Sequence, residues 1–237
     1  LLIYLSGLAL TATPGKVGET FRSALLLPHG VRVPHSFAAF LTDRATDVLG
    51  MLLLGVIAAT VLSQQTYLWV LALIGLLGVS ILLAKIIVCP KADLIWTWLR
   101  NQTFRWIPTA SGRVMIESWA GLWVFPSVVG FTILALIAYG TQALVFAWFC
   151  LSVSVELPLA QLVLIFVKAT LFGAASMLPG GLGAMEASLV YQLMDLGVDS
   201  SIAISLAIAI RLVTLWFGML LGGLAMLSVT NRLRLTV

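Results

Sequence analysis

The stretch LPGGLGAMEASLVYQLMDLGV, residues 178–198, carries the main signal for the fold. It joins a Pro-Gly-Gly break to an apolar segment at 182–196, which is too short to cross a bilayer core because a span needs about 20 apolar residues. Proline removes a backbone donor and glycine loosens the backbone, so we expect two half-helices around a non-helical turn. The pattern predicts a re-entrant helical hairpin whose break comprises Pro179, Gly180, Gly181 and Gly183.

A second interruption of the same kind stands near the start of the chain, in TATPGKVGE (residues 11–19). A short apolar segment at 16–28 follows this Pro-Gly pair, so the sequence predicts a second re-entrant hairpin. Its break comprises Pro14, Gly15 and Gly18.

The two breaks head an internal repeat. In each copy a Gly-Val pair follows the break, and an arginine comes 14 residues after the glycine of that pair, at Arg44 and at Arg211. The alternative is a chance coincidence in an apolar, glycine-rich chain, because the gap between the break and the Gly-Val pair differs by two residues between the copies.

The apolar segments around these landmarks predict the topology. We expect them at about 1–13, 34–62, 66–89, 115–153, 157–178 and 200–229, with a spanning helix over about 126–153. With neither hairpin crossing, three spans separate them, so the two copies, at about 1–62 and about 157–229, face opposite ways. Many transporters are built from such inverted repeats and bind their substrate near the membrane midplane.

Composition excludes an ordinary soluble domain. Of the 237 residues, 61% are hydrophobic and only 9% are charged, whereas a globular domain carries about a quarter charged residues. The mean hydropathy is +1.12. We therefore expect an all-α, polytopic transmembrane helical bundle. Because the chain opens inside the apolar run LLIYLSGLALTA, we expect a single transmembrane domain over 1–237 from which upstream helices are missing.

The basic residues predict which side of the membrane each end faces. They cluster in KADLIWTWLRNQTFRWIPTASGR (91–113) and at Arg232 and Arg234, and positively charged segments favour the cytoplasm. The tryptophans interleaved in 91–113 are typical of an amphipathic segment in the membrane interface, and Trp119 and Trp123 continue this belt. The C-terminus is then cytoplasmic, and the net charge of +4 reports topology, not nucleic-acid binding.

The sequence contains no motif for catalysis, a metal or a cofactor. It has no GxSxG, Walker loop or HExxH. Cys89 and Cys150 lack CxxC or Cys/His spacing, and His29 and His35 lack a further ligand at metal-binding spacing. We expect no catalytic residue, no metal and no cofactor, so any transport is passive, ion-coupled or driven by a partner.

At these motifs the chain resembles the lysylphosphatidylglycerol synthase transmembrane region, a flippase-like family of bacteria and archaea that includes UPF0104-like integral membrane proteins. The stretches that carry the resemblance are PGKVGETFR (14–22), DRATD (43–47), LPGGLGAMEASLVYQLMDLGV (178–198) and RLVTLW (211–216). The resemblance implies a domain of the bacterial or archaeal cell (inner) membrane that moves lipids or lipid-linked sugars between leaflets. Asp43 stands where the family often has Glu, and Lys16 stands where Arg is frequent, so both charges keep their sign.

Three charged residues follow the first break at intervals of three: Lys16, Glu19 and Arg22. They share one helical face near a helix N-terminus, where free N–H groups and two cations could hold a phosphate, with the arginine binding it bidentately. The alternative is a ladder of Lys-Glu-Arg pairs in the membrane interface.

Charges inside the predicted spans need partners, since a charge at the bilayer centre costs about 2.5 kcal/mol or more. Arg44 and Asp47 are three apart on one helix and could pair with each other. Arg211 lies near the middle of the last span with no acid on its own helix, and we expect Glu186, just after the second break, to be its partner. Each pair is either a structural ion pair or part of a gate or phosphate site. Lys168 has no evident partner and either snorkels or lines the cavity.

The leading hypothesis for function is a flippase or transporter that moves an anionic or phosphate-bearing lipid, or a lipid-linked sugar, through a polar cavity between the repeats. One alternative is a membrane-embedded lipid-phosphate transferase with Asp47 or Glu186 as its base, and another is a non-catalytic accessory subunit of a membrane lipid or glycan enzyme. The expected partners are membrane lipids, a second copy of the chain or a membrane enzyme, and no nucleic acid. The GxxxG pair Gly218 and Gly222 indicates close helix packing.

Overall fold

The structure is a computed structural model, and it is all-helical over the residues that it describes, which are 2–10, 30–62 and 109–234 together with 23, 26, 27, 68, 70, 72, 74 and 75. Its elements are α1 (Leu2–Leu8), α3 (Val33–Val61), α6 (Thr109–Leu122), α7 (Phe125–Ser152), α8 (Leu159–Ala175), the 3-10 turn η3 (Pro179–Gly181), α9 (Ala184–Asp195), α10 (Ser200–Arg211), the π-helical segment η4 (Leu212–Trp216) and α11 (Phe217–Arg234). No strand occurs among the described residues. The predicted all-α fold is confirmed.

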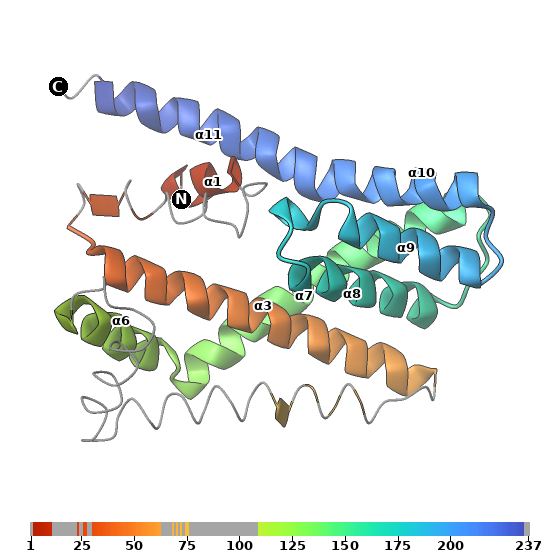
Figure 1. The fold of residues 1–237 in the computed structure, drawn as a ribbon, viewed down its shortest axis with the longest axis horizontal. Helices are drawn as coiled ribbons and strands as arrows, with labels where there is room; N and C mark the ends of the chain where they lie inside the picture. The colour runs from red at the N-terminus through yellow and green to blue at the C-terminus, as the bar shows by residue number, and fades with distance from the viewer. Residues whose placement is uncertain are drawn as a thin grey trace.

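Three of the described helices are long and apolar enough to cross a membrane: α3, α7, and the continuous helix Ser200–Ser228 that joins α10, η4 and most of α11. Each begins and ends within one residue of a predicted span, at 34–62, 126–153 and 200–229. In Figure 1 the start of α3, α6 and the end of α11 lie at one end of the molecule, and the α7–α8 and α9–α10 turns lie at the other.

Prolines start two of these helices. Pro34 of α3 and Pro126 of α7 lie in the first helical turn, where the backbone N–H groups have no partner within the helix and none is lost by proline. Val124, just before α7, is extended with ψ 139°. The apolar run predicted at 115–153 is therefore two helices, α6 and α7.

The same turn precedes two of the spanning helices. Gly30 and Gly197 have φ of +77° and +85°, a conformation that favours glycine. In both turns the glycine amide donates to the carbonyl three residues back and the next amide donates to the carbonyl five residues back, which is a Schellman-type helix end. The bonds are Gly30 N to Leu27 O (3.0 Å), Val31 N to Leu26 O (3.3 Å), Gly197 N to Met194 O (2.9 Å) and Val198 N to Leu193 O (3.0 Å). A long helix begins three residues after each glycine.

The buried core lies between α7, α8, α9 and α10. Its fully buried large side chains are Phe146, Leu162, Phe166, Leu189, Leu193 and Ile210. In Figure 1 α8 and α9 lie side by side below α10, and α3 passes below them and contacts α6, α7 and α8. Large apolar side chains such as Trp148 and Leu220 point outward and are 65% and 67% exposed, as expected for helices that face lipid.

Two glycines let helices approach each other closely. A Cβ atom on Gly50 of α3 would lie 2.8 Å from the Cβ of Ala135 on α7. A Cβ atom on Gly222 of α11 would clash with the backbone at Ala9, which follows α1. Gly218 has nothing within 4 Å of its Cβ position, so of the GxxxG pair only Gly222 makes a close contact in the described part of the chain.

The last span differs from the predicted helix at 200–229 in one respect. It is continuous, but Leu212–Trp216 is π-helical rather than α-helical. A π turn holds one more residue than an α turn and shifts every later side chain around the axis. Four of the five residues in this segment are apolar, so the hydrophobic pattern contains no signal for this shift.

The first predicted hairpin lies outside the described residues. Its break and its charges are Pro14, Gly15, Gly18, Lys16, Glu19 and Arg22. Most of the predicted interfacial segment at 91–113 also lies outside them, except 109–113, which begins α6.

Candidate functional site

The break between α8 and α9 is non-helical, as predicted for Pro179, Gly180, Gly181 and Gly183. The three glycines have φ of +58°, +65° and +83°, which is the left-handed region that favours glycine. The short turn η3 spans Pro179–Gly181, and α9 begins at Ala184. The chain therefore reverses direction between two helices that contact each other along their length.

Glycine is also required here for space. A Cβ atom on Gly181 would lie 3.0 Å from the carbonyl oxygen of Gly173 on α8, and a Cβ atom on Gly173 would lie 2.9 Å from the Cβ of Met185 on α9. Two glycines that face each other bring the break against the end of α8. The break is consequently held in one conformation by packing.

Arg211, the last residue of α10, contacts this break. Its Nε donates to Glu186 Oε1 at 2.6 Å, and its Nη2 donates to Gly180 O at 2.8 Å and to Glu186 Oε2 at 3.5 Å. The expected pairing of Arg211 with Glu186 is confirmed. One guanidinium thus binds both the turn, through the Gly180 carbonyl, and α9, through the Glu186 carboxylate.

The pair is buried unequally. The Arg211 side chain is 9% exposed and the Glu186 side chain is 24% exposed. Glu186 lies in the first turn of α9, where the positive end of the helix dipole favours a carboxylate. Arg211 lies 11 residues after the start of Ser200–Ser228, which is about 17 Å along the helix and near the middle of a bilayer core of about 30 Å.

The guanidinium keeps unused donors. Nη1 makes no hydrogen bond to the described residues, and it is not among the fully buried atoms that lack a partner. The Nη1 donors of this buried side chain are therefore unused among the described residues. Arginine is suited to phosphate because its planar fork can bind two oxygens at once.

The π-helical segment η4 follows Arg211 directly and marks the same level of the last span. Single π turns within α-helices are frequent at functional sites. Thr214 of this segment donates its hydroxyl to the carbonyl of Ile210 at 2.8 Å, which satisfies a carbonyl that the altered turn leaves available.

Gln192 is a polar residue of this region that the sequence analysis missed. Its Nε2 donates to the carbonyls of Ser188 (3.1 Å) and Ile165 (3.3 Å), so it connects α9 to α8. The sequence feature that could have indicated Gln192 is its side-chain amide, which is the single one in the apolar segment 182–196. Gly180 was predicted as a break residue but not as a ligand, because a carbonyl oxygen has no sequence signature.

The second candidate pair lies on α3. Arg44 Nη2 is 3.0 Å from Asp47 Oδ2, with side chains 34% and 23% exposed, so the two pair within one helix as the spacing allows. The Arg44 guanidinium also lies 5.8 Å from the ring centre of Phe40. The hydrogen bonds of Arg211 go to Glu186 and to the Gly180 carbonyl, and none goes to these α3 residues.

Two further predictions concern cations and metals. Lys168 is exposed on α8 and has no hydrogen bond or ion pair within the described part of the chain. Among the described residues no group of three or more His, Cys, Asp or Glu side chains could hold a metal ion.

Comparison with known proteins gives two matches. The model of the lysylphosphatidylglycerol synthase TM region family matches residues 1–222. A UPF0104 membrane protein of Methanothermobacter thermautotrophicus is similar, with 31% identity over 100 residues, which are 42% of this chain. The chain spans 30% of the length of this curated relative. No solved structure matches.

Proposed function

We propose a lipid-transport function for this chain, which belongs to the lysylphosphatidylglycerol synthase transmembrane-region family. In this proposal it moves a phosphate-bearing lipid or lipid-linked sugar between membrane leaflets. The family and the apolar helices support a multi-pass membrane protein with a lipid-related function. The observation that carries the finer proposal is the buried guanidinium of Arg211, which Glu186 and Gly180 hold at mid-span and whose Nη1 donors no described residue uses.

In this proposal the Glu186–Arg211 pair is the gate. A buried arginine must have an anionic or polar partner at every stage, because an uncompensated charge at this depth is costly. A lipid phosphate supplies the same charge and the same paired oxygens as the Glu186 carboxylate. The phosphate first meets Nη1 and then replaces the carboxylate on the guanidinium. When the phosphate leaves, Glu186 returns and the pathway closes.

The lengths of the hairpin helices support a re-entrant arrangement. α9 has 12 residues, about 18 Å of helix, and α8 has 17 residues, about 25 Å of helix. Both are shorter than a bilayer core of about 30 Å. The break then lies within the membrane, where non-helical backbone is tolerated if protein or a polar cavity surrounds it.

The repeated turn supports an inverted repeat. Gly30 and Gly197 share their φ sign, their hydrogen-bond pattern and the distance to the next helix, and each is followed 14 residues later by an arginine, Arg44 or Arg211. In this arrangement Lys16, Glu19 and Arg22 serve the first hairpin as the residues around Glu186 serve the second. The substrate pathway then lies between the two copies.

We also propose that the chain is a transporter of the bacterial or archaeal cell membrane, with a cytoplasmic C-terminus and no catalytic step of its own. Membrane lipids are its ligands, and a second copy or a membrane enzyme is its partner. The transferase alternative would use Asp47 or Glu186 as base, but each carboxylate is paired with an arginine, Arg44 or Arg211.

The test is lipid translocation by the purified full chain in liposomes, followed by leaflet-specific quenching of a fluorescent anionic lipid. We expect wild type to move the lipid and Arg211→Gln to abolish the movement. Arg211→Lys should retain only a small part, since lysine keeps the charge but loses the fork. Glu156→Gln, which neutralises an exposed carboxylate in the α7–α8 turn, is the matched control and should be fully active.

The outcomes separate the alternatives. No movement by any form of the chain, with covalent transfer of a group to or from the lipid phosphate when a donor or acceptor is supplied, would establish the transferase. No activity of the wild type alone and full activity after adding a membrane enzyme would establish the accessory subunit. Normal movement by Arg211→Gln would reject the gate.

A further inference from the structure

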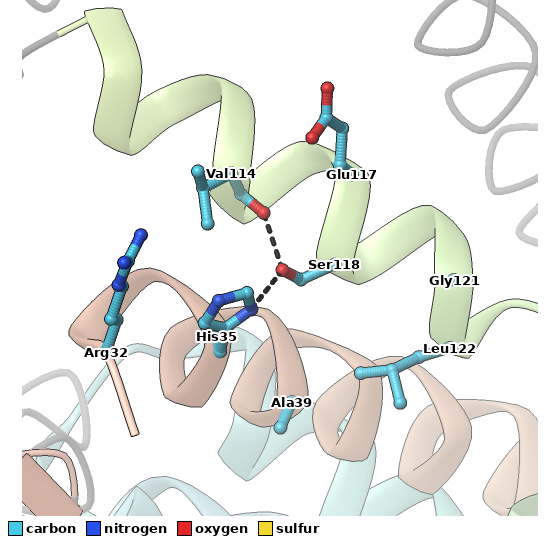
Figure 2. Close-up of a pocket in the computed structure, with 8 residues that line it drawn as sticks. All are labelled: Arg32, His35, Ala39, Val114, Glu117, Ser118, Gly121 and Leu122. Atoms are coloured by element: carbon cyan, nitrogen blue, oxygen red, sulfur yellow. Dashed lines mark hydrogen bonds between the residues drawn. The ribbon is translucent and has the colours of Figure 1, made fainter. Parts of the chain in front are cut away.

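A cavity with polar side chains in its wall lies far from the hairpin, between the start of α3 and α6. Its volume is about 670 Å³, and its walls include Arg32, His35 and Ala39 from the α3 side and Val114, Ser118 and Leu122 from α6. Figure 2 shows these side chains. This volume falls within the range of small-ligand sites, about 300 to 1,000 Å³.

Two linked hydrogen bonds determine which ring nitrogen of His35 carries a proton. The Ser118 hydroxyl donates its one proton to the carbonyl of Val114 at 2.5 Å. The 2.5 Å contact between Ser118 Oγ and His35 Nδ1 therefore has His35 as the donor. The imidazole carries a proton on Nδ1, and the Nε2 edge has no protein partner in the described residues.

Arg32 supplies a cation without a partner. It precedes α3 as the N-cap residue, lines the cavity, and makes no side-chain hydrogen bond or ion pair in the described part of the chain. In Figure 2 its guanidinium extends toward α6, whereas the carboxylate of Glu117 points away from α3. The cavity therefore presents a guanidinium and an imidazole edge to the same space.

The position of the cavity indicates where its ligand comes from. Arg32 stands one residue before a helix long enough to span, so this end of α3 lies at the membrane surface. Trp119 of α6 and Trp123, the residue after α6, have ring centres 5.1 Å apart, and tryptophans are typical of that level of the membrane. Glu117 also lines the cavity, and Ala39, Val114, Gly121 and Leu122 supply its apolar wall.

We propose that this cavity binds the phosphate of an anionic phospholipid at the membrane surface. The phosphate diester lies between Arg32, which can bind two of its oxygens, and His35. A phosphate diester has acceptors only, so His35 binds it as the imidazolium, donating from Nε2 while Nδ1 continues to donate to Ser118. The apolar wall takes the first carbons of the acyl chains. This site is separate from the Glu186–Arg211 gate and stands whether or not the chain moves lipid.

The experiment measures binding of dihexanoyl phosphatidylglycerol to the purified full chain in detergent by isothermal titration calorimetry, with inorganic phosphate as competitor. We expect Arg32→Gln to weaken binding about tenfold or more, the usual effect of losing a charge-assisted hydrogen bond. His35→Gln places an amide N–H near the former Nε2 and should bind better than His35→Asn, which places it near Nδ1. Lys168→Gln, which removes an exposed cation from α8, is the charge-matched control and should bind as wild type.

Three results would overturn the proposal. Equal weakening by Arg32→Gln and Lys168→Gln would mean that general positive charge, not this cavity, attracts the lipid. Equal competition by inorganic phosphate at the same concentration would assign the cavity to a soluble phosphate. Unchanged binding by both Arg32→Gln and His35→Asn, in variants whose melting temperature equals that of wild type, would place the lipid elsewhere.

Discussion

Arg211 and Glu186 should behave as one energetic unit. Removing one member of a buried ion pair typically costs about 3 to 5 kcal/mol, and removing both can be nearly neutral. We therefore expect Glu186→Gln and Arg211→Gln each to lower the free energy of unfolding, and the double variant to regain much of the loss. Denaturant unfolding in detergent measures this cycle.

The control for this cycle is Glu156→Gln combined with Arg211→Gln. Glu156 is exposed and lies outside the pair, so these two changes should add. Additive losses for Glu186→Gln with Arg211→Gln would mean that the two side chains do not interact in the membrane protein.

Asp199 should make stability depend on pH at the start of the last span. Its carboxylate accepts from the amide of Ser201 at 2.8 Å and from the Ser201 hydroxyl, and these bonds hold the pKa of Asp199 below its usual value. A lowered folded-state pKa stabilises the fold above the unfolded-state pKa, and this contribution is lost as the pH falls through the folded-state pKa.

The measurement for Asp199 is the melting temperature against pH. Wild type should melt higher than Asp199→Ala at neutral pH, and the difference should shrink as the pH falls below the usual range of an aspartate. Asp199→Asn keeps a capping acceptor without a titrating proton, so its advantage over alanine should not change with pH. A constant gap between wild type and Asp199→Ala would contradict the capping role of the charge.

For single residues, ion pairs could be predicted from the sequence better than hydrogen bonds to the backbone. The pairing of Arg211 with Glu186 could be predicted because an arginine at mid-span must find an acid, and the sequence offers one just after the break. The contact to the Gly180 carbonyl could not be predicted, because every residue has a carbonyl. The Arg44–Asp47 spacing allowed a pair within one helix, and the structure contains it.

At the scale of elements, the bounds of the three spanning helices could be predicted to within a residue because prolines and apolar runs mark them. Pro34 and Pro126 explain the starts of α3 and α7, and the glycines of the break explain the end of the α8 segment. The π-helical η4 could not be predicted, since four of its five residues are apolar and the hydrophobic pattern gives no signal for an added residue in the turn. The position of α6 against α3, and with it the cavity at Arg32, depends on tertiary packing between segments far apart in sequence.

The break should tolerate substitution at one glycine better than at another. Gly181 and Gly183 both have positive φ, but only a Cβ on Gly181 meets a neighbour, the Gly173 carbonyl at 3.0 Å. Alanine in the left-handed region costs about 1 to 2 kcal/mol at either position, and crowding at Gly181 adds about 1 to 3 kcal/mol. We expect Gly181→Ala to unfold at clearly lower denaturant concentration than Gly183→Ala. Equal effects would mean that α8 moves aside without cost.

For the molecule as a whole, the ends of the helices predict the sidedness. The start of α3 and the end of α11 lie at one end in Figure 1, and the α7–α8 turn lies at the other. Single cysteines at positions 105 and 234 should react with a membrane-impermeant reagent from the cytoplasmic side, and a cysteine at position 156 from the outside. The background is a chain with Cys89 and Cys150 replaced by alanine. Opposite sides for positions 105 and 234 would contradict the inverted repeat.

The chain order of the Glu186–Arg211 pair also has a consequence for biosynthesis. Glu186 precedes Arg211 by 25 residues, so the ribosome releases the acidic hairpin before the arginine reaches the translocon. We therefore expect the Glu186 carboxylate to be in the membrane when the last helix inserts. Arg211 can then pair with it at once and avoids the cost of inserting an unpaired arginine, about 2.5 to 3.5 kcal/mol. Glu186→Gln should for this reason lower the fraction of newly made chains whose last helix is inserted, which glycosylation tags on its two flanks would report. An unchanged inserted fraction would mean that the last helix inserts without help from the carboxylate of the hairpin.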